Sequence, residues 1–506
     1  MTKDSYLRIL DNRGNKIPLS MFVPPYEGAA SGRRMSTWGT STIGPNAAIY
    51  GSLSNLRSRS RELIRNNPLI DGAIDDFVAD VIGSGIAPRW QLEDKGLKKE
   101  LQDLWNDWTM EADFYARADF YGLQSLICRT YMDAGESLTR LIPVRMDQAD
   151  TVPLKLHIIE ADLLDHAYNS FAPNGNEIRM GIEISKDAQR LAYWLFRDHP
   201  GEAFITQGNW AERIPIPANQ IIHVFRQLRP GQMRGRPWLS SILVKIHELD
   251  QYDDAELVRK KGAALLGSAY ITEPMGGQID PADYFGQRKT ADSEGRDVIA
   301  LEPGTFPVLP PGMDVKFPNP HDPGTSYEPW KKDQYRQIAV GMRRTYDQLT
   351  GDLRDVNYSS IRAGLLRIRR ILMQLQHQDL VFQFCQPIAA AWLDAVVLSG
   401  KIIIRDYLQN RYKYLRINWR PDGWPWVDPL KDTLSEKMAK RSGFKSRAQI
   451  IAEQGGDIET VDQEIAEDNA REDELNLIYD SDSRKTAGSG AMQKTEDDFL
   501  VNAIKD

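Results

Sequence analysis

The segment from residue 327 to residue 400 constrains the fold most, because it holds two long helical patterns joined by a short polar loop. In the first pattern, apolar residues recur every three or four positions, which is the spacing of one helix face. These residues are Tyr335, Ile338, Ala339, Met342, Tyr346 and Leu349. Gly351 follows them, at a position where a left-handed backbone can end a helix with least strain. The sequence therefore predicts an amphipathic helix that ends at Gly351.

The opposite face of this predicted helix is basic. It carries Lys331, Lys332, Arg336, Arg343 and Arg344. A second long helix is predicted after the polar loop, with Ser359 or Ser360 as its cap. Pro387 interrupts its apolar pattern, but apolar residues continue as far as Gly400. We therefore expect a kinked helix rather than a broken one.

Length and composition indicate a folded protein with more than one packed region. A chain of 506 residues exceeds the size at which one hydrophobic core keeps growing. No apolar run reaches the ~18 to 20 residues that a membrane-spanning helix needs, and the N-terminus lacks an apolar signal core, so we expect a cytosolic protein. Cys128 and Cys385 lie in apolar helical patterns, which favours buried free thiols over a disulfide or a metal site.

Several separated motifs resemble the lambda family of bacteriophage portal proteins. The most distinctive is LTGDLRDVNYSSIRAGLL, which spans residues 349–366. Four more follow the order of the family: AAIYGSLSNLRSRSRELIRNN at residues 47–67, the segment 83–88, IEADLLD at residues 159–165, and HVFRQLRPGQMRGRPW at residues 223–238. The similarity covers roughly residues 30 to 400. Several motifs in one order are far more specific than any single motif.

The resemblance implies an α+β portal-type fold that assembles as a ring, twelvefold in the family. The segments that we expect are an extended N-terminal arm at 1–45, an α/β wing at 46–236, a first stem helix at 237–267, a small α/β clip at 268–325, a second stem helix at 326–350, a tunnel loop at 351–360, a long kinked helix with wing strands at 361–430, a helical crown at 431–478 and a disordered acidic tail at 479–506.

The resemblance also implies a function and a set of partners. The ring would sit at one capsid vertex of the virion, after assembly in the host cytoplasm, and double-stranded DNA would be packaged and ejected through it. Expected partners are the terminase large subunit, a head-completion or tail connector protein, the major capsid protein and the scaffold, with no membrane. A net charge of −8 argues against a tight grip on DNA, but it suits a conduit through which duplex must slide.

The tunnel loop is the expected site of DNA contact. Its candidate residues are Asp352, Arg354, Asp355, Asn357 and Tyr358. A polar loop between two helices must face solvent, and inside a ring that solvent fills the channel. We expect Arg354 to touch phosphate weakly, because the acidic residues on either side temper its charge. The alternative is that Asp352, Asn357 and Ser359 only cap the helix junction.

Two other charged features have alternative interpretations. Four arginines crowd the second half of the helix expected from Asn46 to residue 65, and they are Arg57, Arg59, Arg61 and Arg65. They fit solvated charge near a helix C-terminus, or pairing with acidic residues of a neighbouring subunit. His223, in IIHVF, fits a strand histidine with its hydrogen bonds satisfied better than a catalytic base.

No catalytic, cofactor or metal motif stands in a convincing context. The sequence lacks H-E-x-x-H, G-x-S-x-G, zinc-spaced cysteine pairs and a strand-turn-helix G-x-G-x-x-G. The nearest approach to a phosphate loop, GSGAMQKT, has Gln493 where the second glycine belongs. We therefore expect a non-enzyme without cofactors. The alternative is a metal-dependent DNA-processing enzyme that uses the carboxylates of TGDLRD.

Overall fold

The computed structural model describes residues 33, 37–202, 212–266, 290–291, 297–298, 327–354, 357–424, 428–477, 479 and 484. The expectations for the N-terminal arm, the clip and the C-terminal tail therefore lie almost entirely outside the described residues. The described part mixes helices with small antiparallel sheets, which confirms the predicted α+β class.

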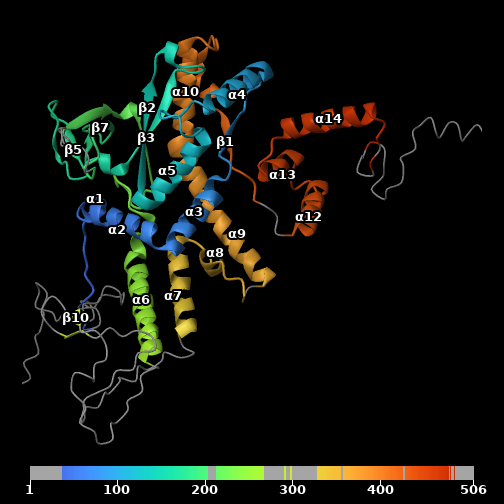
Figure 1. Cartoon of the computed structure of the whole chain (residues 1–506). Coiled ribbons are helices and arrows are strands. Elements are labelled where there is room, and N and C mark those ends of the chain that lie inside the picture. The colour runs from blue at the N-terminus through green and yellow to red at the C-terminus, as the bar shows by residue number, and fades with distance from the viewer. Residues whose placement is uncertain are drawn as a thin grey trace, which may run out of the picture.

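A pair of helices descends from the body side by side (Figure 1). They are α6 (Leu243–Leu266), which follows the short turn η7 (Trp238–Ser241), and α7 (Tyr327–Met342). Asp253 of α6 joins them, since it accepts a hydrogen bond of 2.7 Å from the Tyr327 hydroxyl and pairs with Lys331 at 2.8 Å. Within the range 237–267, where one helix was predicted, the structure has the turn η7 followed by α6, so the α-helix begins later than predicted.

The helix predicted over 326–350 is interrupted, which corrects the sequence analysis. Helix α7 ends at Met342, Arg343 adopts a left-handed backbone with φ of 63°, and α8 (Tyr346–Thr350) begins after Thr345. Thr345 and Gln348 form a reciprocal capping box at the start of α8. The sequence predicted one continuous helix because the apolar residues keep the same helical spacing before and after this turn. Gly351 ends α8 with φ of 68°, as predicted.

The second long helix runs without a break through three parts, α9 (Tyr358–Leu375), the π-helical η10 (Gln376–Cys385) and α10 (Gln386–Ser399). Its irregularity precedes Pro387 instead of centring on it. Pro387 lies in the first turn of α10, and the wider π turns before it relieve the clash between its ring and the preceding carbonyl groups.

This helical run carries the centre of the core. Residues Ser360–Ser399 are long and apolar enough to cross a membrane by length and composition, so the expectation that no such run exists is wrong here. Core packing explains the composition. Trp392 of α10 is fully buried with Trp90, Trp105 and Trp108, at ring centroid distances of 5.1 to 6.3 Å from them. Cys128 and Cys385 are buried free thiols, as predicted.

The N-terminal third contributes five helices, of which α3 packs directly against α9. They are α1 (Pro45–Tyr50), α2 (Leu53–Asn66), α3 (Pro68–Ile82), α4 (Lys95–Thr109) and α5 (Phe120–Ala134). The single helix expected from Asn46 to residue 65 is divided, since α1 ends at Tyr50 and α2 begins at Leu53, and Asn46 lies in the first turn of α1. Its side chain binds the Gly231 carbonyl at 2.9 Å and the Met233 N–H at 2.8 Å.

Every strand pair in the described residues is antiparallel. One sheet has the order β3-β2-β9, from Leu154–Ile159, Glu136–Pro143 and Ile221–Phe225. A second has the order β4-β5-β6-β7-β8, from Ser170–Phe171, Glu177–Arg179, Ile182–Ile184, Arg190–Phe196 and Arg213–Pro217. Two-stranded pairs join β1 (Ala87–Trp90) to β12 (Ile417–Arg420) and β10 (Thr290–Ala291) to β11 (Asp297–Val298). Short turns are η4 (Met146–Gln148), η5 (Ala161–Leu163) and η6 (Ala218–Gln220).

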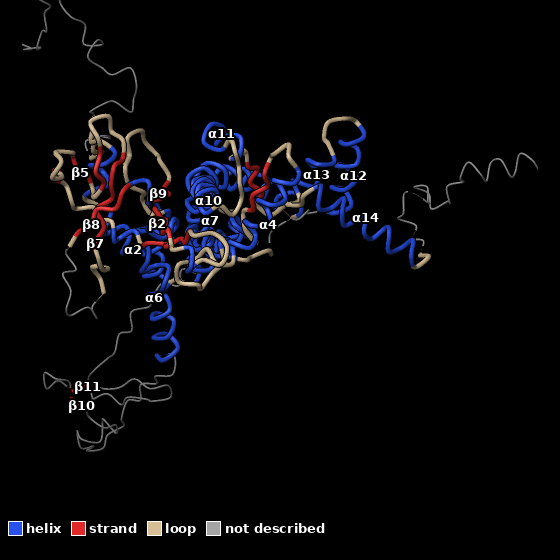
Figure 2. The backbone as a smooth tube through the Cα atoms, turned by 90° about the horizontal axis from the view of Figure 1, so that it is seen from above, coloured by secondary structure: helices blue, strands red, loops and turns tan. Residues whose placement is uncertain are grey.

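The C-terminal helices extend to one side of the body in both views (Figure 2). After α11 (Tyr407–Tyr414) they are α12 (Pro429–Arg441), α13 (Arg447–Glu453) and α14 (Ile458–Glu474). Ser446 caps α13 in a capping box, as its sequence predicts. Arg420 pairs with Asp457 at 2.7 Å, and Lys98 pairs with Glu459 at 2.6 Å. These contacts tie the C-terminal helices to the body.

Candidate functional site

The loop after α8 carries an ion pair within itself. The Arg354 guanidinium donates from Nε and Nη2 to the two carboxylate oxygens of Asp352, at 2.8 Å each. These bonds hold the pKa of Asp352 well below its usual range and raise the pKa of Arg354. The Arg354 side chain is nevertheless 73% exposed, so it stays accessible to a ligand. Its positive charge is partly compensated before any ligand arrives.

Asn357 is a helix cap. Its side chain accepts the Ser360 N–H at 2.9 Å, and the Ser360 hydroxyl oxygen accepts the Asn357 N–H at 3.3 Å. The capping interpretation is therefore confirmed for Asn357. Asp355 and the side chains of Tyr358 and Ser359 lie outside the described residues, so their predicted roles stay predictions.

The five basic residues of the predicted helix face are not brought together. Lys331 pairs with Asp253, and Lys332 pairs with Glu328 at 3.3 Å. The Arg336 guanidinium lies 5.7 Å from the centre of the Tyr346 ring. Because the helix ends at Met342, the next two arginines leave its periodicity.

Arg344 is buried whereas Arg343 is exposed, so the prediction that both lie on one basic helix face is wrong. Arg344 is buried, pairs with Asp80 of α3 and lies 5.2 Å from the Phe77 ring centre. Arg343 is exposed. Arg344 therefore fastens the end of α7 to the body and is not part of an exposed basic surface.

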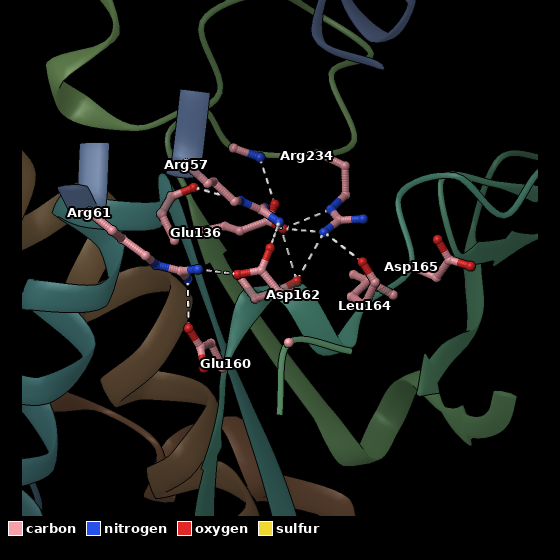
Figure 3. Close-up of polar contacts among 12 residues, drawn as sticks. Arg57, Arg61, Glu136, Glu160, Asp162, Leu164, Asp165 and Arg234 are labelled. Carbon is pink, nitrogen blue, oxygen red and sulfur yellow. Dashed lines mark hydrogen bonds and ion pairs between the residues drawn. The ribbon is translucent and has the colours of Figure 1, made fainter. Parts of the chain in front are cut away.

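A fully buried carboxylate organises the polar interior (Figure 3). Glu136, at the start of β2, accepts hydrogen bonds from Arg57 at 2.5 Å, Arg234 at 2.7 Å and the Gly235 N–H at 2.7 Å. His223 Nε2 lies 3.1 Å from its other oxygen. Burial alone would raise the pKa of Glu136, but the two arginines and His223 hold that pKa well below its ordinary value.

This network overturns one expectation and confirms another. Arg57 was expected to be solvated or to pair with a neighbouring subunit, yet its side chain is 1% exposed and its partners lie in its own chain. His223 is a satisfied strand histidine, as predicted, since its Nδ1 also lies 3.5 Å from the Tyr193 hydroxyl. Sequence reasoning missed the pairing of Glu136 with Arg234, because the two residues lie 98 positions apart in the sequence.

The network extends to the motif at residues 159–165. Arg61 binds both Asp162 and Glu160, the latter at 2.8 Å, and Arg57 lies 3.4 Å from Asp162. Arg234 donates to the carbonyls of Met180 at 2.9 Å and Leu164 at 3.1 Å. Three of the sequence motifs quoted above therefore meet in one buried cluster, which joins α2, β2, β9 and η5.

One group of side chains in the described ranges could be mistaken for a metal site. Ligand atoms of Glu160, Asp162 and His199 lie within 4.8 Å of one another. Arg61 already supplies a positive charge to both carboxylates, so a cation would have to displace a formed ion pair. In TGDLRD, Asp352 is likewise bound by Arg354. Neither arrangement resembles an open catalytic metal centre.

Comparison with known proteins agrees with these motifs. The family model for phage portal proteins of the lambda family matches residues 31–376, and the chain belongs to this family. It is 30% identical over 437 residues to a protein named "Probable portal protein" of Halomonas phage phiHAP-1, across 84% of this chain and 81% of that protein. It is 20% identical over 508 residues to portal protein B of Escherichia phage lambda, across 93% and 94% of the two chains.

A solved structure aligns over most of the chain as well. A chain in the neck of a native GTA particle, computed with C12 symmetry, is 15% identical, and the alignment covers 83% of this chain and 97% of that chain with a TM-score of 0.42. The family assignment rests on the sequence matches.

We expect Glu136→Ala to lower the free energy of unfolding by about 3 to 5 kcal/mol, because it leaves Arg57 and Arg234 buried without a countercharge. Urea denaturation of the variant and the parent protein measures the difference. The control is Glu177→Ala, which removes an exposed carboxylate paired with Arg179 and should leave the free energy of unfolding nearly unchanged, because a solvated ion pair contributes little. Equal effects of the two substitutions would contradict the role given to Glu136.

We expect His223 to make the protein less stable as the pH falls. Burial lowers the pKa of His223 to about 4, from an ordinary value of 6.5, although Glu136 opposes this shift. Between these two pH values the unfolded chain binds a proton that the folded chain does not, so stability decreases on acidification by up to about 1.4 kcal/mol per pH unit. Denaturation midpoints of the parent protein and His223→Gln, measured from pH 7 to pH 4.5, should show a shallower slope for the variant. Parallel slopes would refute this assignment.

Proposed function

We propose that this chain is the subunit of a closed ring at one capsid vertex, through which double-stranded DNA is packaged and ejected. Membership of the portal family carries the proposal. The helix pair α6 and α7 supports it, since two helices that leave the body and return can line a channel (Figure 1). The ring belongs to the virion, and it assembles in the host cytoplasm.

The width of a channel follows from helix packing. Adjacent helices pack with their axes ~8 to 10 Å apart, so twelve stem helices around an axis make a circle of roughly 30 to 38 Å. Helices about 10 Å thick leave roughly 20 to 28 Å clear. That opening is close to the width of B-form DNA, which favours twelve subunits.

Within this channel we assign the loop from residue 351 to residue 360 to weak DNA contact. Arg354 is exposed, and Asp352 compensates part of its charge. A contact of this kind attracts phosphate without holding it, which suits duplex that must move. Asn357 would serve the loop indirectly, by fixing the start of α9.

The remaining assignments concern partners and chemistry. We assign the segment 268–325 to docking of the terminase large subunit and later of a connector protein, and the body to contact with the capsid protein and scaffold. ATP hydrolysis would belong to the terminase motor, and this subunit would not be an enzyme. The arginines that already bind Asp352, Glu160 and Asp162 disfavour the alternative of a metal-dependent DNA-processing enzyme.

Ring assembly tests the proposed function directly. We expect the purified protein to form closed rings of one size, because a portal must encircle the duplex. Mass photometry and electron-microscopic class averages measure the size and the symmetry. Nuclease and ATPase assays on the same sample provide the control for the alternative. Only dimers or open filaments at every salt concentration, or metal-dependent turnover by a monomer, would refute the proposal.

Arg354→Ala tests the loop. We expect normal rings with altered packaging efficiency or DNA retention, because the substitution removes a channel charge without disturbing a buried contact. Packaged DNA per particle, measured at several salt concentrations, gives the readout. Arg145→Ala removes another exposed arginine, 78% exposed, and serves as the control. Unchanged packaging and retention in Arg354→Ala would leave only a structural role for the loop.

A further inference from the structure

A small cavity lies where the helix pair joins the body, and it is lined by three arginines. Its volume is about 120 Å³, and its lining includes Arg226, Arg236 and Arg343. These residues come from three places: the end of β9, the segment before η7 and the turn after α7. A single water needs roughly 10 to 15 Å³ of such space, so the cavity has room for a larger polar group.

Close backbone approaches build the walls of this cavity. Gly135 has φ of 85°, and a side chain there would overlap the backbone of Arg236. A side chain on Gly341 would overlap Ile242. The two glycines therefore allow α5 and α7 to press against the segment around η7, which makes the cavity a fixed feature of the packing.

The lining of the cavity is basic. No carboxylate lines the cavity, and within the described part of the chain none of its three arginines forms an ion pair with one. The Arg226 guanidinium lies 5.4 Å from the centre of the Trp238 ring. Asp379 lines a second cavity together with Arg226 and interacts with the Arg226 charge, and it also accepts a hydrogen bond from Tyr131 at 2.7 Å. Arg236 and Arg343 therefore carry the positive charge of the first cavity that has no carboxylate beside it in its lining.

Arg343 reaches the cavity through a strained backbone. Its φ of 63° is unfavourable for a residue with a β-carbon, by roughly 1 to 3 kcal/mol. The turn persists because the Arg344 N–H donates to the Ala339 carbonyl at 2.8 Å and the buried Arg344 side chain holds Asp80. Such strain concentrates at functional sites, and here it places a third positive charge beside the other two.

We propose that this cavity binds a phosphate group, and that in the assembled ring the DNA backbone supplies it. Guanidinium groups match phosphate oxygens in paired hydrogen bonds, and three of them suit a tetrahedral group better than a planar carboxylate. Arg236 and Arg343 are exposed, so the phosphate can enter from solvent. The inference that the cavity binds phosphate depends only on the cavity itself, whereas the inference that DNA supplies this phosphate rests on the proposed function.

The first arm of the test uses inorganic phosphate on the full chain. We expect phosphate to raise the melting temperature of the parent protein, relative to chloride at equal ionic strength, and to lose this effect in the double variant Arg236→Gln with Arg343→Gln. Arg343→Lys, which keeps the charge, should retain part of the effect. Arg145→Gln is the control, because it removes an exposed arginine that does not line the cavity. Absence of a phosphate effect in the parent protein would overturn the proposal.

The second arm uses a short duplex, with binding measured by fluorescence anisotropy across salt concentrations. Each lost phosphate contact should reduce the slope of log K against log salt by about 0.9, so the double variant should show a slope lower by about one or more than both the parent and Arg145→Gln. An unchanged slope with lost phosphate binding would overturn the DNA source and leave a site for free phosphate.

Ring assembly of the same variants separates the remaining outcomes. Rings that fail only in the double variant would identify a carboxylate of a neighbouring copy as the occupant, and would overturn the proposal. Failure of the parent protein to form rings would refute the proposed function. The effect of phosphate on the melting temperature could still be measured on the unassembled chain, so the two outcomes are distinguishable.

Discussion

The burial of Glu136 is the constraint on which the rest of the structure depends. A carboxylate removed from water is costly unless charged and hydrogen-bonding partners replace its hydration. Arg57 arrives from α2 and Arg234 from the segment before η7, so neither is local to β2. Each of these charges would be destabilising alone. The three elements therefore become stable together, and the body assembles around them as one unit.

The same network orients the helix pair. Gly235 donates its N–H to Glu136, and the chain then passes through Pro237 and η7 into α6. At the other end, Arg344 fastens the turn after α7 to Asp80. Both helices are thus anchored by a buried charge where they meet the body. In a ring, force on the helix pair would pass directly into these anchors, since neither junction is a free hinge.

Much of this architecture could be predicted from the sequence, and the failures share one physical cause. Local sequence patterns predicted the positions of most helices, the end of a helix at Gly351 and the helix cap at Ser446. They could not place Arg57, because a charge on a helix face appears solvated until its partner is known, and that partner lies in a distant strand. The left-handed backbone at Arg343 was hidden for a related reason, since tertiary contacts of Arg344 hold the turn. Sequence motifs in a shared order were informative because they meet in the network.

The distribution of compensated charge bears on the contact with DNA that we propose. With a net charge of −8, long-range attraction to duplex is weak, so contacts must be local. Lys331 and Arg354 each carry their own carboxylate partner, which reduces the free energy available from any one phosphate. Arg236 and Arg343 differ from them, since no carboxylate lines the cavity that these two arginines share. Under the proposed function, duplex would slide past the compensated charges, and the cavity arginines would add a contact that retains it.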